Sequence, residues 1–255
     1  MKTLLQITRP PETWKDLQNE ISQILRECDF CAEVDKSIET ARGTVDVDVY
    51  AEDRSRTPEI KYLIECKNWK IRIPKTIAHA FRTVVSDFGA NVGLIVSSAG
   101  FQSGAFDAVK KSPIKLLDWK EFQDLFINVW IEKHFAPELY KTVDPLSEYT
   151  EPINSRIFRK ADLLSKERQT KFKELRTKYF RLAVYASMLS FPFPEFRKPL
   201  PRVPLKKSLQ DLDFLGIDLP QDVLDAITLR GFLEALLRNC ISATAEFDEV
   251  FGERA

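Results

Sequence analysis

The sequence predicts an α/β fold, in which a mixed central sheet is flanked by helices and is followed by an all-α C-terminal domain. The first observation is an alternation of strand-like and helix-like segments over residues 60–117, which is the signature of a parallel βαβ unit. The second is that strand signals vanish from about residue 128 onward. We therefore expect two domains, residues 1–128 and residues 129–255, which suits a length of 255 residues.

Apolar residues at helical spacing predict the opening helix, from Trp14 to about Cys28, with Thr13 as its N-cap. Alternation of Val45, Val47 and Val49 with polar residues predicts a strand with one apolar face. The other elements expected in the first half are a short strand at residues 31–35, a connector at 36–42, a polar loop at 52–59, a strand at 60–66, a helix at 75–87 that Gly89 ends, a strand at 92–96, a helix at 104–111, a strand at 114–117 and a helix from Asp118 to about His134.

The second half is predicted to be helical on both sides of a proline-rich segment. Periodic apolar residues indicate helices within residues 153–190 and within residues 218–251. Five prolines between Phe191 and Pro204 exclude a helix there. We expect that segment to be a loop or a semi-rigid linker.

The formal net charge is zero, so any attraction to nucleic acid must come from local patches rather than from the whole chain. Residues 151–210 hold 15 Lys and Arg against 5 Asp and Glu, whereas residues 211–255 hold 3 against 10. Two interpretations are open. Either the two segments pair with each other, within the domain or across a dimer, or the basic helices contact phosphates.

No apolar run approaches the roughly 20 residues that span a bilayer. The N-terminus lacks the long apolar core and the cleavage site of a signal peptide, so we expect a cytoplasmic protein without membrane association. Cys28 and Cys31 form a C-x-x-C pair, but a structural zinc site needs a second such pair or a nearby histidine cluster. We expect these two cysteines to be reduced thiols at a helix end.

The most specific chemistry lies in the pair of strands that carry Asp48, Glu65 and Lys67. Glu65 and Lys67 are two residues apart, so both point to one face of their strand. If the two strands are antiparallel neighbours, Asp48 meets them at one point. Two carboxylates beside an ammonium are costly unless a cation binds between the acids. Mg²⁺, which commonly takes one or two carboxylates, is the expected occupant.

This arrangement, Asp-x(16)-Glu-Cys-Lys across two strands, resembles the PD-(D/E)xK nuclease superfamily and, more closely, the Mrr-like restriction endonuclease catalytic domain. The resemblance covers roughly the first half of the chain. Val47 stands where the superfamily's motif has proline, a departure that does not touch the chemistry. The segments that carry the resemblance are residues 14–17, 43–49, 63–69, 89–97, 100–105 and 114–118.

The resemblance implies a restriction-endonuclease-like fold and a role for each residue of the motif. Asp48 and Glu65 would bind Mg²⁺, which Mn²⁺ would be able to replace, and the backbone carbonyl of Cys66 would add an oxygen ligand. Lys67 would orient or deprotonate the attacking water. Asp46 is the rival of Asp48 and retains a possible auxiliary role.

Members of the superfamily often draw another acid from the opening helix. Here that position falls on Gln18, which would be a departure, or on Glu20, which would be a further metal ligand. Candidate contacts to the phosphate backbone are Lys70, Arg72, Lys75, His79, Gln102 and Ser103. The alternatives are a solvated loop for Lys70, Arg72 and Lys75, a tight turn for Gln102 and Ser103, and a structural role for His79.

We expect a Mg²⁺-dependent endonuclease that acts on DNA. Double-strand cleavage needs two active sites, so a homodimer or a higher oligomer is expected, with the helical domain as the place for that contact, for DNA contact or for regulation. A setting in restriction or phage defence, with a possible defence-system partner, follows by analogy alone. The alternatives are a catalytically silent subunit that docks DNA or a partner, and an effector nuclease that a ligand or partner activates.

Overall fold

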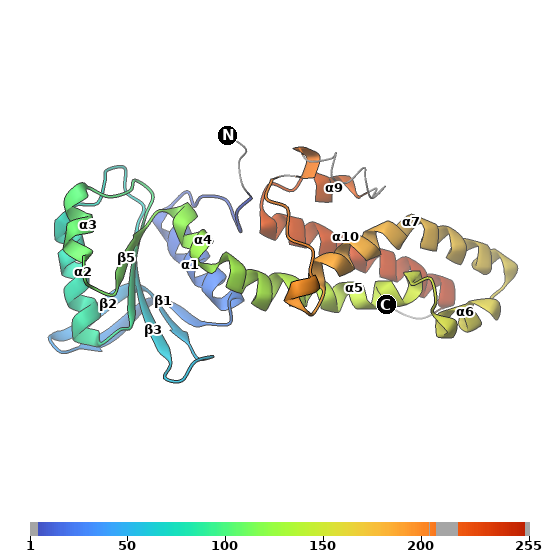
Figure 1. Ribbon diagram of the computed structural model, residues 1–255, viewed down its shortest axis with the longest axis horizontal. Coiled ribbons are helices and arrows are strands. Elements are labelled where there is room, and N and C mark those ends of the chain that lie inside the picture. The colour runs from blue at the N-terminus through green and yellow to red at the C-terminus, as the bar shows by residue number, and fades with distance from the viewer. Residues whose placement is uncertain (1–4, 204, 208–218, 253–255) are drawn as a thin grey trace. The chain divides into compact units, whose positions relative to one another are not determined.

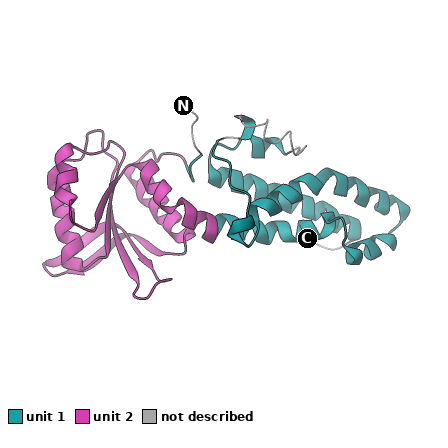
Figure 2. Cartoon of the chain, in the orientation of Figure 1, with its two compact units in different colours: residues 1–8, 134–255 teal, residues 9–133 magenta. Residues whose placement is uncertain are grey.

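The computed structural model describes residues 5–203, 205–207 and 219–252 (Figure 1). The chain divides into two compact units, one of residues 9–133 and one of residues 1–8 with 134–255 (Figure 2). Backbone hydrogen bonds from Leu5 to Arg202 and from Leu229 to Gln6 tie the first described residues to the helical unit. The boundary between the units falls after residue 133, and the N-terminal segment belongs with the helices.

The unit of residues 9–133 is built on a mixed five-stranded sheet of order β1-β2-β3-β4-β5. The first two pairings are antiparallel, and the last two are parallel. The strands are β1 (Cys31–Thr40), β2 (Gly43–Asp53), β3 (Ile60–Lys67), β4 (Val92–Ser97) and β5 (Ile114–Leu117). The predicted α/β class with a mixed sheet and a helical C-terminal region is confirmed.

Helices cover both faces of this sheet (Figure 1). One face packs against α1 (Trp14–Glu27) and α4 (Trp119–Trp130), and the other against α2 (Lys75–Phe88) and α3 (Ser103–Val109). Capping boxes start α1 and α4, as the sequence predicts for the first with Thr13 and for the second with Asp118. Gly89 ends α2 at a φ of 75°, a left-handed conformation that glycine adopts without strain.

The predicted connector at residues 36–42 is wrong, because β1 continues to Thr40 and pairs with β2 as far as Thr40↔Gly43. The segment is rich in charged residues and lies at the edge of the sheet. Charged side chains on an edge strand oppose pairing with another chain. They also remove the apolar alternation by which a strand is found in a sequence.

The helical unit is formed mainly by three long helices that pack on one another, α5 (Ala136–Thr150), α7 (Lys166–Ser190) and α10 (Leu229–Phe251). Its shorter elements are α6 (Ser155–Asp162), α9 (Gln221–Leu224) and the 3-10 turns η2 (Pro194–Phe196) and η3 (Leu205–Lys207), and a π-helical turn η1 (Ile131–Phe135) precedes α5. The proline-rich loop is found as expected over its described residues, whereas the expected helix start at Asp218 lies outside them. None of the described helices is both long and apolar enough to cross a bilayer.

Gly93, in β4, is expected to tolerate no side chain. A Cβ there would lie 2.8 Å from Val85 Cγ2, 3.0 Å from Ile114 Cγ1 and 3.1 Å from Phe81 Cε1. All three neighbours belong to the core between the sheet and α2. Because overpacking of a filled core costs about 1–3 kcal/mol, Gly93→Ala should lower the free energy of unfolding by that amount in urea titrations. Unchanged stability would contradict this packing.

Thiol reactivity should separate Cys31 from the other cysteines. Cys31 is exposed, whereas Cys28, Cys66 and Cys240 are buried. Burial raises the pKa of Cys28 and of Cys240 to about 12, so almost no thiolate forms at pH 8. One thiol per chain should react rapidly with a disulfide reagent, and Cys31→Ser should remove that reaction. Rapid labelling of a second cysteine in the native protein would contradict the assigned burial.

Candidate active site

The site begins where β2 and β3 part. Their antiparallel pairing ends at Val49↔Ile64. Asp48, which precedes Val49 in β2, therefore has no backbone partner on β3. Its side chain fills that place, since Asp48 Oδ2 accepts a hydrogen bond of 2.6 Å from the backbone N–H of Cys66. The separation of the strands thus turns a strand carboxylate toward the end of β3.

Glu65 and Lys67 lie beside that carboxylate. Lys67 Nζ forms an ion pair with Glu65 Oε1 and lies 3.9 Å from Asp48 Oδ2. The three side chains are 15 % (Lys67), 15 % (Asp48) and 24 % (Glu65) exposed, so the cluster is largely desolvated but still open to solvent. The structure therefore brings together the three residues that the sequence singled out.

The ionised form of Glu65 is disfavoured within the cluster. Burial raises the pKa of its carboxyl group, the hydrogen bond and charge of Lys67 oppose that rise, and the charge of Asp48 adds to it. One ammonium therefore does not compensate both carboxylates. A bound divalent cation would favour the ionised form of Glu65 and relieve this imbalance.

The oxygen atoms around the cluster suit a hard divalent ion. Asp48 and Glu65 supply carboxylates, and the Cys66 carbonyl lies between the two functional side chains of β3. The indole N–H of Trp14 donates to that carbonyl at 3.1 Å, and a carbonyl oxygen has a second lone pair to offer. The described residues include no cluster of three or more Asp, Glu, His or Cys side chains placed to hold a metal, so a backbone oxygen and waters would complete the coordination, as Mg²⁺ often requires.

The opening helix contributes Gln18 to the site. Gln18 Nε2 donates hydrogen bonds of 3.0 Å to Asp48 Oδ1 and to Asp35 Oδ1. The Gln18 side chain is fully buried, and its Oε1 has no hydrogen-bond partner among the described residues. Glu20 lies two residues further along α1, on a different side of the helix. The opening helix therefore places an amide, rather than an acid, beside Asp48.

Sequence reasoning missed Asp35. The β1–β2 register passes from Val34↔Val49 to Lys36↔Val47, so Asp35 lies opposite Asp48. Asp35 has a φ of 50°, a left-handed conformation that aspartate tolerates better than most residues. Such backbone conformations gather at functional sites. The sequence signal available was only an aspartate in a segment interpreted as the end of a short strand.

Asp46 does not join the cluster. It lies opposite Ser37 of β1, is exposed, and accepts a hydrogen bond from the Ser37 hydroxyl. This hydrogen bond joins Asp46 to the edge strand rather than to β3.

The candidate phosphate contacts are all exposed and lie on segments that follow β3 and β4. An isolated bridge between Ile73 and Phe101 joins these two segments, and Gln102 Nε2 donates to the Arg72 carbonyl at 3.5 Å. The segments therefore lie side by side beyond the ends of the two parallel strands. The residues concerned are Lys70, Arg72, Lys75, His79, Gln102 and Ser103.

Comparison with protein families finds that the model described as "Restriction endonuclease", the Mrr catalytic domain, matches residues 12–126. No curated protein matches the chain. A solved structure described as "Protein of Unknown Function AF1548" is similar at 15 % identity, with a TM-score of 0.39, over 94 % of this chain and 99 % of that one. The family match spans the sheet, the helices α1, α2 and α3, the first part of α4, and every residue of the cluster described above.

Proposed function

We propose, from the premise that residues 12–126 belong to the Mrr-like restriction endonuclease domains, that this protein is a Mg²⁺-dependent endonuclease that hydrolyses phosphodiester bonds of DNA. The observation that carries the proposal is the gathering of Asp48, Glu65 and Lys67 around one point at the end of β3. A nuclease domain with this cluster has the groups that phosphodiester hydrolysis requires.

The proposed metal ligands are Asp48, Glu65 and the Cys66 carbonyl. A divalent ion bound there would neutralise charge on the phosphoryl group and make a water molecule more acidic. The hydrogen bond from the Cys66 N–H fixes one oxygen of Asp48, and Gln18 holds the other. Both oxygens are therefore oriented before any ligand binds, which reduces the reorganisation needed for catalysis.

Lys67 is proposed to act on the attacking water and on the developing charge of the phosphoryl group. Its ammonium lies within reach of both carboxylates, so it can donate a hydrogen bond to a water or a phosphoryl oxygen placed between them. Trp69, whose ring centroid lies 5.8 Å from Lys67 Nζ, adds a second contact that limits where the ammonium can move.

The exposed residues that follow β3 and β4 are proposed to position the phosphate backbone next to this cluster. A homodimer would bring two such sites to the two strands of a duplex. Restriction of foreign DNA is the setting that the family suggests.

The test is cleavage of supercoiled plasmid, methylated and unmethylated, by the purified protein. Nicking or cutting that requires Mg²⁺ or Mn²⁺ and stops with a chelator is the expected result. DNA binding without cutting in either metal would support a silent docking subunit instead. Cutting that begins only when a ligand or partner is added would support an activated effector.

A further inference from the structure

The helical unit carries a strongly basic hollow along α7. It has a volume of about 880 Å³. Four of the described residues that line it are cationic, and none is acidic. The lining residues are Thr150, Lys173, Arg176, Thr177, Lys178, Phe180 and Arg181. A concave surface with one sign of charge concentrates ligands of the opposite sign. The hollow therefore favours an anionic ligand.

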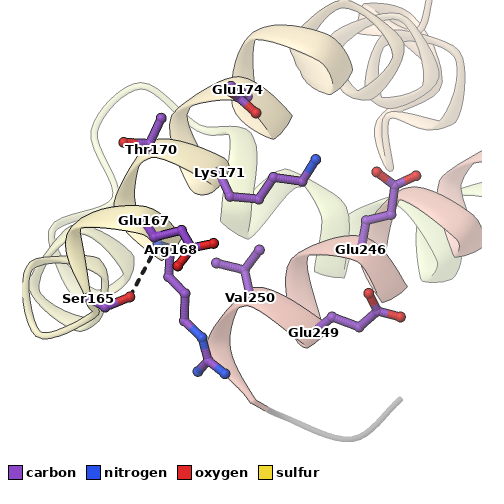
Figure 3. A pocket seen from close by; sticks show the side chains of 9 residues that line it. All are labelled: Ser165, Glu167, Arg168, Thr170, Lys171, Glu174, Glu246, Glu249 and Val250. Atoms are coloured by element: carbon purple, nitrogen blue, oxygen red, sulfur yellow. Dashed lines mark hydrogen bonds between the residues drawn. The ribbon is translucent and has the colours of Figure 1, made fainter.

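A second hollow, further toward the start of α7, has a different charge balance. It has a volume of about 840 Å³, and Figure 3 shows Arg168 and Lys171 of α7 near Glu246 and Glu249 of α10. Its lining residues are Ser165, Glu167, Arg168, Thr170, Lys171, Glu174, Glu246, Glu249 and Val250. Four glutamates outnumber its two cations. The attraction for an anion is thus specific to the first hollow and is not a property of the whole helix.

Two cations of the basic hollow are already engaged. Lys178 forms an ion pair of 3.1 Å with Glu246. Arg176 Nη2 donates to the carbonyl of Glu151 at 2.9 Å, and its guanidinium lies 4.6 Å from the centroid of the Phe158 ring. Pairing between the basic and acidic segments of the chain, one of the two interpretations of the uneven charge, accounts for Lys178.

That pairing does not account for Lys173 and Arg181. Both are exposed, and neither has an ion-pair partner among the described residues. They are eight residues apart on α7, so their Cα atoms are about 12 Å apart at ~1.5 Å per residue. Thr177 lies between them on the same face, four residues from each. A ligand with anionic groups repeated along its length can engage both cations at once, as a phosphodiester strand does.

Phe180 places an exposed aromatic ring beside these cations. Its side chain is 40 % exposed, next to Arg181. It also lines an adjoining, mainly apolar hollow of about 350 Å³ together with Val184, Met188 and Phe196. Exposed aromatic rings beside a track of cations form the surface on which single-stranded nucleic acids bind, with bases stacked on the rings.

We propose that the basic hollow of α7 binds a nucleic-acid strand, with phosphates on Lys173 and Arg181 and a base against Phe180. This extends the proposed endonuclease function by assigning a second substrate contact, in the helical unit. The contact is sequence-independent, because phosphates carry no base information and every base has a face that can stack.

The experiment measures binding of a fluorescent oligo-dT strand by the full-length protein, with a chelator present so that nothing is cut. The double variant Lys173→Ala/Arg181→Ala should bind roughly tenfold more weakly, and the slope of log K against log salt should fall by about 1.4, since each phosphate contact contributes ~0.7 for a single strand. Phe180→Ala should weaken binding about fivefold or more with the salt slope unchanged.

The matched control is Arg168→Ala/Lys171→Ala, which removes the same charge from the same helix but from the hollow that holds glutamates. It should bind within about twofold of the wild type, because affinity falls only when the residues that neutralise phosphates are replaced. Equal losses in the two double variants would overturn the proposal, as would a loss in neither. Displacement of the strand by poly-glutamate at equal charge concentration would also overturn it, in favour of an acidic protein partner.

The same preparations assayed for plasmid cutting in Mg²⁺ distinguish this inference from the proposed function. A wild type that binds through α7 but never cuts would contradict the endonuclease and leave the α7 contact standing. A Lys173→Ala/Arg181→Ala variant that binds and cuts like the wild type would refute the α7 contact and leave the endonuclease standing.

Discussion

Replacing Lys67 with alanine should reduce Mg²⁺-dependent DNA cleavage on the order of 10³-fold, because loss of one group that stabilises charge in the transition state costs about 10²–10³-fold. The side chain lies between Glu65 and Asp48 and is only 15 % exposed, so solvent cannot replace its ammonium in the same position. The measurement is the initial rate of plasmid nicking at saturating metal.

Two further variants and a control make this result specific. Asp48→Asn and Glu65→Gln, which keep the side-chain shape, should each reduce cleavage at least as much as Lys67→Ala does. Lys61→Ala is the matched control, because Lys61 lies on the same face of β3 six residues away, near the ring of Phe88. Its cleavage should equal that of the wild type. Wild-type cleavage by Lys67→Ala, with unfolding curves unchanged, would refute the assigned site.

Local geometry and the family resemblance together predicted this cluster. Period-2 alternation puts Glu65 and Lys67 on one face of their strand. The choice of Asp48 over Asp46 rested on the resemblance, because these two aspartates are also two residues apart. The succession of short apolar strands and helical segments was likewise enough to place β3, α2, β4 and β5 within one or two residues.

What could not be predicted depends on contacts between distant parts of the chain. Trp14 donates to a carbonyl 52 residues away, and Gln18 reaches a carboxylate 30 residues away, so neither interaction leaves a pattern in the local sequence. Asp35 is a different case, since its place in the site requires a φ of 50°. Backbone conformation of a single non-glycine residue is not encoded in hydrophobic periodicity.

Gln18→Glu should make the stability of the unit of residues 9–133 depend strongly on a divalent metal. The new carboxylate would lie, fully buried, where the amide now donates to Asp48 and Asp35. Without metal, two hydrogen bonds are lost and three acids face one another, at a cost of about 3 kcal/mol. That corresponds to a melting temperature roughly 10 °C lower. Thermal unfolding in a chelator measures this directly.

Ca²⁺ or Mn²⁺ should then restore more stability to Gln18→Glu than it adds to the wild type, because a third carboxylate strengthens binding to the native state and stabilisation rises with affinity. Asn19→Asp is the matched control: it makes the same amide-to-acid change on the exposed side of α1, where surface substitutions usually stay within about 0.5 kcal/mol. If Gln18→Glu melts with the wild type in chelator, or if neither metal shifts it more than the wild type, Gln18 does not adjoin a metal site. The result is independent of catalysis, so it tests metal coordination by the cluster without a cleavage assay.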